Sequence, residues 1–278
     1  MTYVDDCIII GQNMSQVDSV IKSLQEGDED FELTDEGSID KYLGVLIEDI
    51  DKTSFKMSQP FLARRILEFM SLDENRTKKR NTPVGKPLLN RDLDGVPRKH
   101  PWVYRGAVGM LSYYCDSVRP EIQMDVHQTA QFSINPMRSH ELAIMRIVRY
   151  LLDNPDGCIT YKIDTSKGHE VYADADFAGA WDKADSDNAD NVLSCTGFVI
   201  CYANCPIVWC SKLQTEIALS TAEAEYIALS HALREAIPIQ NMSKESNCIF
   251  PMHMPTPEFC IAVHEDNLST IAMEESIS

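Results

Sequence analysis

The chain has 278 residues, a formal net charge of −18 at pH 7 and a hydrophobic fraction of 44%. This fraction excludes an intrinsically disordered acidic chain, and the length suits one large domain or two smaller ones. The negative charge argues against loose, charge-driven nucleic-acid binding, which needs Lys and Arg to contact phosphates. Because neither a secretory leader nor a membrane-length apolar run occurs, we expect an intracellular chain, cytoplasmic or nuclear, that is not secreted and binds no membrane.

The N-terminal stretch predicts a hairpin followed by helices and strands. Asp5 and Asp6 precede the apolar run in YVDDCIIIG, a pattern that favours a tight turn leading into a buried strand. A surface turn explains the two acids equally well. The spacing of apolar residues then predicts helices over Ser15–Leu24 and Phe61–Met70 and strands over Phe31–Leu33, Tyr42–Ile47 and Ser54–Met57.

The composition becomes basic and proline-punctuated from Arg76 to Arg105, a range that includes Lys78, Lys79 and Arg80. Such a segment suits contact with phosphates, and a solvated linker is the competing interpretation. Helices are predicted next, over Tyr104–Asp116, Pro120–Phe132 and Ser139–Leu152.

The last of these helices has an apolar face, with Leu142, Met145, Val148 and Leu152 expected inward. Arg146 and Arg149 are expected outside. There they either grip a nucleic-acid backbone or keep the surface soluble.

A turn over Asn154–Gly157 marks the predicted domain boundary, and a strand over Cys158–Ile163 follows it. The stretch HEVYADADF then alternates like a strand, with Asp174 and Asp176 on one face. Two carboxylates side by side on a strand repel each other, which indicates a functional role. A hairpin is expected over Ser194–Ile200 and Pro206–Trp209.

The next helix has a capping box, with Ser220 at the N-cap and Glu223 three residues later. Glu225 falls in the apolar row of this helix, where it either reaches water at the edge or meets a compensating cation. A strand over Phe259–Val263 ends shortly before Asp266. A strand Asp, a helix Glu and a strand-end Asp can converge on divalent ions for phosphodiester hydrolysis by a two-metal route.

Two other groups of residues are expected to have no such role. Cys195, Cys201, Cys205 and Cys210 lack the CxxC spacing of a zinc site, so buried free thiols are favoured over a zinc module. The acidic run over Asp182–Asp190 lacks a calcium-loop pattern and is expected to be solvated.

Together, the runs YADADFAGAWD, SCTGFVI, PIVWCSKLQTEIALSTAEAEYIAL and EDN resemble the ribonuclease H domain of copia-type LTR retrotransposon Pol polyproteins. The resemblance implies Mg²⁺-dependent endonucleolytic hydrolysis of RNA in RNA–DNA hybrids. It assigns the catalytic and metal-binding roles at a two-ion Mg²⁺ site to Asp174, Glu225 and Asp266. Asp176, on the same face of the strand, is the alternative to Asp174, because spacing alone does not exclude it.

The N-terminal half is similar to the reverse transcriptase of the same family. YVDD followed by CIIIG resembles the palm motif of this RNA-directed DNA polymerase, which implies metal-binding roles for Asp5 and Asp6. FELTDEGSIDKYLGVLIE resembles the end of the palm, and WVYRGAVGMLSYYCDSVRPEI resembles the thumb and connection. The family's other palm aspartate and its fingers precede this stretch, so we expect no DNA synthesis from the chain itself.

The resemblance divides the chain into residues 1–75, the C-terminal part of the palm, residues 76–157, a basic linker with a helical thumb, and residues 158–278. The last part is expected to be a C-terminally truncated ribonuclease H-like mixed sheet with helices, so the fold class is α+β or α/β. The implied partners are an RNA–DNA hybrid or other nucleic acid and the remainder of the Pol polyprotein. The alternative is a catalytically inactive relic, or a non-enzymatic chain that binds nucleic acid or protein.

Overall fold

The computed structural model describes residues 2–3, 6–11, 13–26, 34, 37, 39–71, 80–83, 85, 89–185, 187–249, 260–268 and 270–271. Its α-helices are α1 (Met14–Gln25), α2 (Pro60–Met70), α3 (Tyr104–Ser117), α4 (Gln123–Ala130), α5 (Arg138–Asp153) and α6 (Thr221–Ile249). Its strands are β1 (Thr2–Tyr3), β2 (Asp6–Cys7), β3 (Lys41–Tyr42), β4 (Val45–Asp51), β5 (Ser54–Ser58), β6 (Ile159–Lys162), β7 (His169–Asp176), β8 (Cys195–Tyr202), β9 (Cys205–Leu213) and β10 (Ile261–His264).

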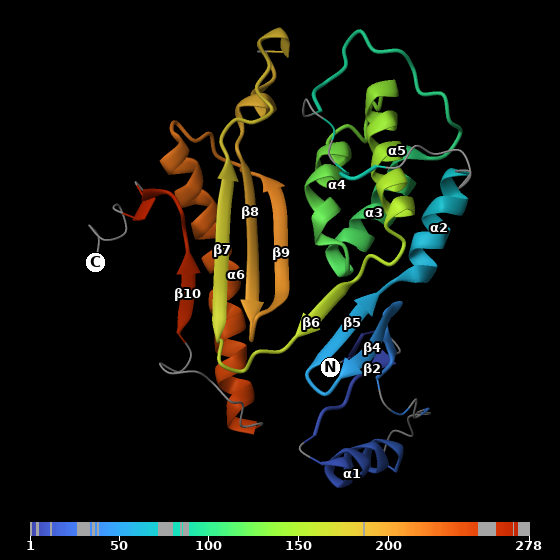
Figure 1. The fold of residues 1–278 in the computed structure, drawn as a ribbon, viewed down its shortest axis with the longest axis vertical. Coiled ribbons are helices and arrows are strands. Elements are labelled where there is room, and N and C mark those ends of the chain that lie inside the picture. Colours follow the sequence, from blue (N-terminus) through green and yellow to red (C-terminus); the bar gives the residue numbers. More distant parts are fainter. Residues whose placement is uncertain are drawn as a thin grey trace.

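The described strands form two four-stranded sheets, ordered β3-β4-β5-β6 and β10-β7-β8-β9, and the pair β1-β2 (Figure 1). Figure 1 shows α2 to α5 grouped beside the second sheet and above the first. Helices and mostly antiparallel strands thus occur in separate groups, so the fold is α+β, as the sequence predicts.

The N-terminal hairpin is present but short. β1 and β2 are antiparallel, with Tyr3 opposite Asp6. The buried strand expected after the two acids is wrong, because β2 ends at Cys7 and Ile10 is 70% exposed. α1 confirms the first predicted helix and begins after Asn13, whose side chain accepts a hydrogen bond from the Gln16 N–H at 3.1 Å. Phe31–Leu33 lies outside the described residues.

The first sheet differs from the prediction in two ways. The single strand expected over Tyr42–Ile47 is two strands, because Leu43 and Gly44 adopt φ values of 49° and 78° and turn β3 back onto β4. β6, which follows the predicted domain boundary, pairs antiparallel with β5, and the Phe55 and Tyr161 rings stack at 4.7 Å. The segment after Gly157 therefore completes the first sheet before the chain enters the second.

The helical group α2 to α5 surrounds a core that includes Leu111, Val126 and Ile144. The predicted helices are confirmed, except that the one over Pro120–Phe132 divides into a 3-10 turn over Pro120–Ile122 and α4. Leu142 was expected inward and is 45% exposed. The buried face of α5 is rotated away from Leu142, because it also carries the buried polar residues His140 and Glu141.

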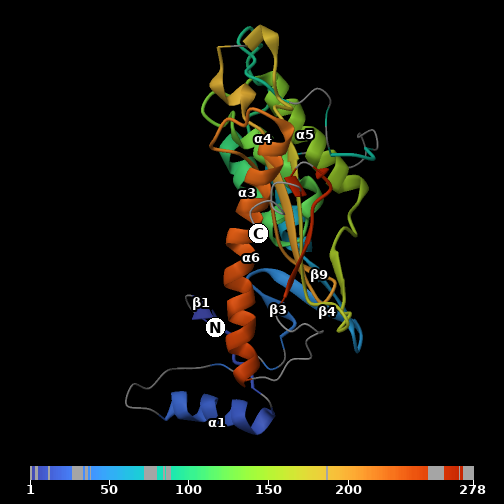
Figure 2. The same cartoon turned by 90° about the vertical axis from the view of Figure 1, so that its left-hand side faces the viewer.

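The second sheet is covered on one face by α6, which lies behind β7 and β8 in Figure 1 and along one side of the molecule in Figure 2. Val171 and Ile200 pack against Leu229 and Ala232 of the helix. The predicted hairpin is confirmed as β8 and β9, joined by Ala203 and Asn204, whose φ values of 50° and 66° are typical of a type I′ turn.

Among the described helices, none has the length and apolar character needed to cross a bilayer.

Candidate metal centre of three carboxylates

The first carboxylate of the centre is placed by strand pairing. β10 runs parallel to β7 and its last pair is His264 opposite Tyr172, so Asp266 follows β10 at the end of the sheet where Asp174 lies on β7. Along β7, Val171 and Ala173 are buried under α6 while Tyr172 and Asp174 are exposed, as the alternating pattern predicts.

The second carboxylate is placed by the start of α6. The Ser220 hydroxyl accepts the Glu223 backbone N–H at 3.2 Å, which confirms the predicted N-cap. The Glu223 carboxylate accepts the Leu219 N–H at 2.7 Å, one residue earlier than a standard capping box requires. The buried Gln214 amide donates to the Ala224 carbonyl at 2.8 Å. These bonds fix the first turn of α6, and Glu225 therefore faces the sheet.

The third carboxylate is held by the loop after β10. The Asn267 side chain accepts the Thr270 N–H at 3.1 Å, and the buried Thr270 hydroxyl donates to the Ala222 carbonyl of α6 at 3.2 Å. This loop is thereby bonded to the first turn of the helix that carries Glu225. Asp266 lies between the end of β10 and these two hydrogen bonds.

Asp174, Glu225 and Asp266 converge, as the sequence predicts. One oxygen from each carboxylate lies within 4.8 Å of the others. Asp174 and Asp266 are exposed, whereas Glu225 is 8% exposed and its Oε2 has no hydrogen-bond partner in the described part of the chain. The centre is thus open to solvent on one side and closed by α6 on the other.

The environment of Glu225 favours its neutral form. Burial, followed by the negative charges of Asp174, Glu265 and Asp266, raises the pKa of Glu225 to about 7, although a hydrogen bond from the Ala175 N–H opposes the shift. Three carboxylates at this spacing repel one another in the absence of a cation. The oxygen-only donor set, with one buried oxygen free, fits a hard divalent ion such as Mg²⁺.

Glu265 was not predicted as part of this centre. It is half-buried, its Oε1 accepts the Asn267 N–H at 2.9 Å, and its charge raises the pKa of Glu225. Its position beside Asp266 in HEDN was a signal available in the sequence. Neighbouring residues of a strand point to opposite faces, so strand alternation would separate Glu265 from Asp266. β10 ends at His264, so that rule does not apply to Glu265.

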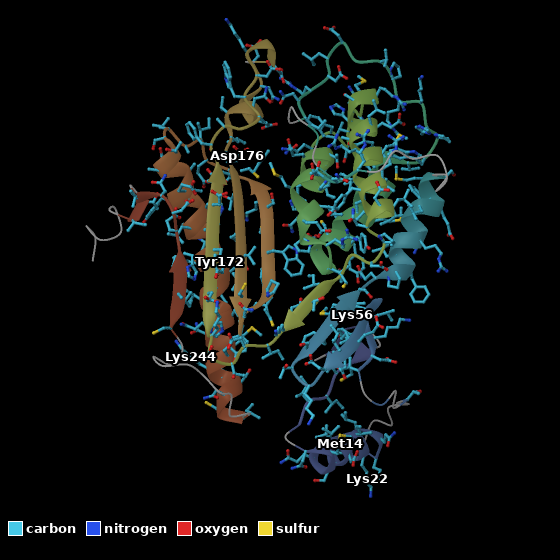
Figure 3. The ribbon with its side chains drawn as sticks, viewed as in Figure 1. Met14, Lys22, Lys56, Tyr172, Asp176 and Lys244 are labelled. Carbon is cyan, nitrogen blue, oxygen red and sulfur yellow. The ribbon has the colours of Figure 1, made fainter. Side chains whose placement is uncertain are left out.

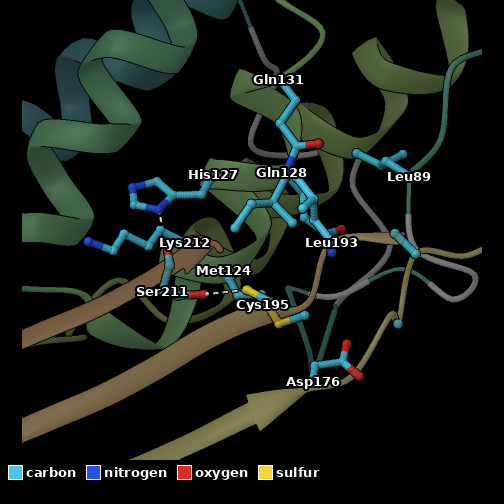
Figure 4. Close-up of a pocket in the computed structure, with 13 residues that line it drawn as sticks. Leu89, Met124, His127, Gln128, Gln131, Asp176, Leu193, Cys195, Ser211 and Lys212 are labelled. Carbon is cyan, nitrogen blue, oxygen red and sulfur yellow. Dashed lines mark hydrogen bonds between the residues drawn. The ribbon is translucent and has the colours of Figure 1, made fainter. Parts of the chain in front are cut away.

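Asp176 lies outside the three-carboxylate cluster. It is the last residue of β7, opposite Cys195, and it lines a separate pocket with His127 and Ser211 (Figures 3 and 4). The first acid of the ADAD run, Asp174, is therefore the one that the fold brings to Glu225.

The predicted nucleic-acid contacts are only partly described. Arg80, Arg146 and Arg149 are half-buried. The Arg80 N–H donates to the Asp153 carboxylate, and an Arg146 Nη donates to the Thr82 hydroxyl at 3.1 Å. Lys78 and Lys79 lie outside the described residues. Their role in nucleic-acid binding stays a prediction.

Of the two palm-like aspartates, Asp5 lies outside the described residues and Asp6 belongs to β2.

The acidic segment over Asp182–Asp190 is not simply solvated, because Asp185 is 7% exposed and its carboxylate accepts from an Arg91 Nη at 2.6 Å. The cysteines described by the structure are free thiols, with Cys115 and Cys205 buried.

Comparison with known proteins relates the chain to transposon polyproteins. It is 30% identical over 236 residues to the retrovirus-related Pol polyprotein from transposon RE1 of Arabidopsis thaliana and 31% identical over 261 residues to that from transposon TNT 1-94 of Nicotiana tabacum. These matches cover 84% and 88% of the chain but only 15% and 18% of the relatives.

A transposon Ty5-1 protein of Saccharomyces cerevisiae is 28% identical over 237 residues, and the match covers 84% of the chain and 72% of that protein. No protein-family model matches the chain. Because several Pol polyproteins align with most of the chain at about the same identity, the chain belongs to the retrovirus-related Pol polyproteins of copia-type transposons.

Proposed function

We propose that the chain binds Mg²⁺ through Asp174, Glu225 and Asp266 and hydrolyses the RNA strand of RNA–DNA hybrids. The convergence of these three carboxylates from β7, α6 and the loop after β10 carries the proposal. The Pol polyprotein relatives and the ribonuclease H-like motifs around each acid support it.

Each side chain has a definable part in the proposed reaction. Asp174 and Asp266 present exposed oxygens on the side from which a phosphodiester can approach. Glu225 supplies the buried oxygen, and the Ala175 N–H orients its carboxylate. Glu225 releases its proton when a cation is bound, because the repulsion that favours the neutral form is then neutralised. Bound Mg²⁺ supplies Lewis-acid stabilisation of the charge on the phosphate.

The same proposal assigns the parts of the chain. Residues 1–75 correspond to the end of a reverse transcriptase palm, residues 76–157 to a basic linker with a helical thumb, and residues 158–278 to ribonuclease H. Because β6 pairs with β5, the first and the last of these parts contribute strands to the same sheet. Arg146 and Arg149, with the basic residues 78–80, are the proposed contacts to the nucleic-acid backbone.

The test is cleavage of a hybrid with a labelled RNA strand in Mg²⁺. The wild-type chain is expected to cleave RNA, and Asp174→Asn and Glu225→Gln each to lower the rate on the order of 10²–10³-fold, because metal stabilisation of several kcal/mol is lost. Asp176→Asn is the matched control on the same strand and is expected to retain activity.

Two results contradict the proposal. One is the absence of cleavage by a wild-type chain that circular dichroism shows to be folded. The other is cleavage that survives both Asp174→Asn and Glu225→Gln, since the reaction then proceeds without the three-carboxylate centre.

A further inference from the structure

A second group of metal-ligating side chains lies where the helical group meets the second sheet. Cys115 and Asp116 belong to the last turn of α3, and His127 belongs to α4. A sulfur, a carboxylate oxygen and a ring nitrogen from these residues all lie within 4.8 Å of one another. None of the three belongs to the carboxylate centre, and the sequence pattern did not connect them.

The hydrogen bonds around His127 prepare it to bind a cation. Its Nδ1 contacts the backbone carbonyl of Ser211 in β9, which is the dashed line that starts at the His127 ring in Figure 4. A carbonyl oxygen only accepts, so Nδ1 carries the proton and Nε2 keeps its lone pair. This arrangement, an imidazole fixed by a carbonyl on its other nitrogen, is the usual outer support of a metal-binding histidine.

The other two ligands are also held in place. The Asp116 carboxylate accepts the Gln123 amide at 2.8 Å, and the Cys115 Sγ lies 3.5 Å from the same carboxylate oxygen. Cys115 is buried, His127 is half-buried and Asp116 is exposed. The group is therefore closed toward the core and open on the Asp116 side, which provides a path for an ion.

We propose that Cys115, Asp116 and His127 bind one Zn²⁺-class transition-metal ion. A thiolate, an imidazole and a carboxylate form a donor set that suits Zn²⁺ and its spectroscopic substitute Co²⁺ better than Mg²⁺, with water as the fourth ligand. The Cys115 thiol loses its proton to solvent when the metal–sulfur bond forms.

The place of the site in the fold indicates what the ion does. The Cys115 carbonyl accepts the Trp209 indole N–H of β9 at 3.0 Å, and His127 contacts Ser211 of the same strand. An ion held by α3 and α4 therefore strengthens the contact of the helical group with the sheet that carries Asp174. This role does not depend on the proposed nuclease activity.

The test is titration of the full chain with Co²⁺ under reducing conditions. We expect one equivalent to produce a thiolate-to-cobalt charge-transfer band in the near ultraviolet, and Zn²⁺ to abolish the band and raise the melting temperature. Cys115→Ser is expected to remove the band, and Asp116→Asn, at an exposed position, to weaken Co²⁺ binding more than about tenfold. Cys201→Ser and Glu225→Gln are controls that are expected to retain the thiolate-to-cobalt band.

The wild-type titration alone can overturn the proposal, because a chain that is folded by circular dichroism and gives no thiolate band has no such site. A band that persists in folded Cys115→Ser, or that disappears in Cys201→Ser, places the ion on other cysteines and also overturns it. If Cys115→Ser does not fold, Asp116→Asn decides: unchanged Co²⁺ affinity in that variant rejects the site.

Discussion

Glu225 occupies a position that helix packing alone disfavours for a carboxyl group. It lies one turn before Leu229, on the side of α6 that packs against β7, and burial together with three acids raises its pKa to about 7. An acid whose pKa is higher in the folded chain binds its proton more tightly there than when unfolded. Its contribution to stability is therefore full below the unfolded pKa near 4.5 and is lost as the pH rises toward 7.

The raised pKa of Glu225 leads to a stability prediction for Glu225→Gln. In metal-free buffer the wild-type chain should lose stability between pH 5 and pH 8, and the variant should lose less, because the amide has no proton to release. Above pH 7 the variant is expected to be more stable than wild type by about 1–3 kcal/mol. Urea unfolding at several pH values measures both.

Glu235→Gln changes an exposed carboxylate further along α6 and is the matched control for the substitution. Equal pH dependence in wild type and Glu225→Gln would show that the carboxyl of Glu225 titrates normally in the folded chain.

At the scale of elements, α5 is attached to the loop before α3 through one buried carboxylate. Glu141 is fully buried and accepts the backbone N–H groups of Lys99 and His100 at 3.1 and 2.9 Å. Burial opposes its ionisation, but these two N–H groups and the Arg138 guanidinium together lower the pKa of Glu141. The contribution of Glu141 to stability is thus present above its unfolded pKa and is lost in acid, whereas that of Glu225 is lost as the pH rises.

Glu141→Ala is predicted to destabilise the chain by about 3–5 kcal/mol, since it leaves Arg98 and Arg138 without their ion-pair partner and two backbone N–H groups without their acceptor. The matched control is Glu48→Ala, which breaks an exposed ion pair with Lys56 and should cost less than about 1 kcal/mol. Urea denaturation at pH 7 compares them, and similar losses in the two variants would contradict the anchoring role of Glu141.

At the scale of the whole molecule, the second sheet meets the helical group along β9. Figure 1 shows β9 as the edge strand nearest α3 and α4. Trp209 contributes its indole N–H to the Cys115 carbonyl and its own carbonyl to the Gln123 amide at 3.5 Å. These contacts connect the sheet that carries Asp174 to helices far from it in sequence.

Trp209→Phe keeps most of the apolar contact and removes the indole N–H. We predict a loss of about 1 kcal/mol in unfolding free energy and faster amide hydrogen exchange at the end of α3. Trp181→Phe, at a residue that is 56% exposed, is the matched control and should change stability by less than about 0.5 kcal/mol. Unchanged exchange in Trp209→Phe would show that the indole bond does not hold the two groups together.

The sequence by itself determined the features that depend on local spacing. Alternation identified β7, apolar periodicity identified α2, α3 and α5, and Ser220 identified the start of α6. The acids of the candidate centre could also be predicted from the sequence, because each lies at a recognisable place on its strand, helix or loop. Glu225 stands out as a charged residue in an apolar row. These patterns depend on neighbours within a few residues, which is the range that backbone geometry and capping bonds span.

Only the tertiary structure decided which distant segments meet. The pairing of β6 with β5, the choice of Asp174 over Asp176, and the approach of Cys115 to His127 all depend on register and packing between elements. Leu142 was expected inward but is exposed, because buried polar groups such as Glu141 take part of that helix face. A polar side chain is buried only when partners from elsewhere in the chain bond to it or share its charge, and local sequence does not reveal those partners.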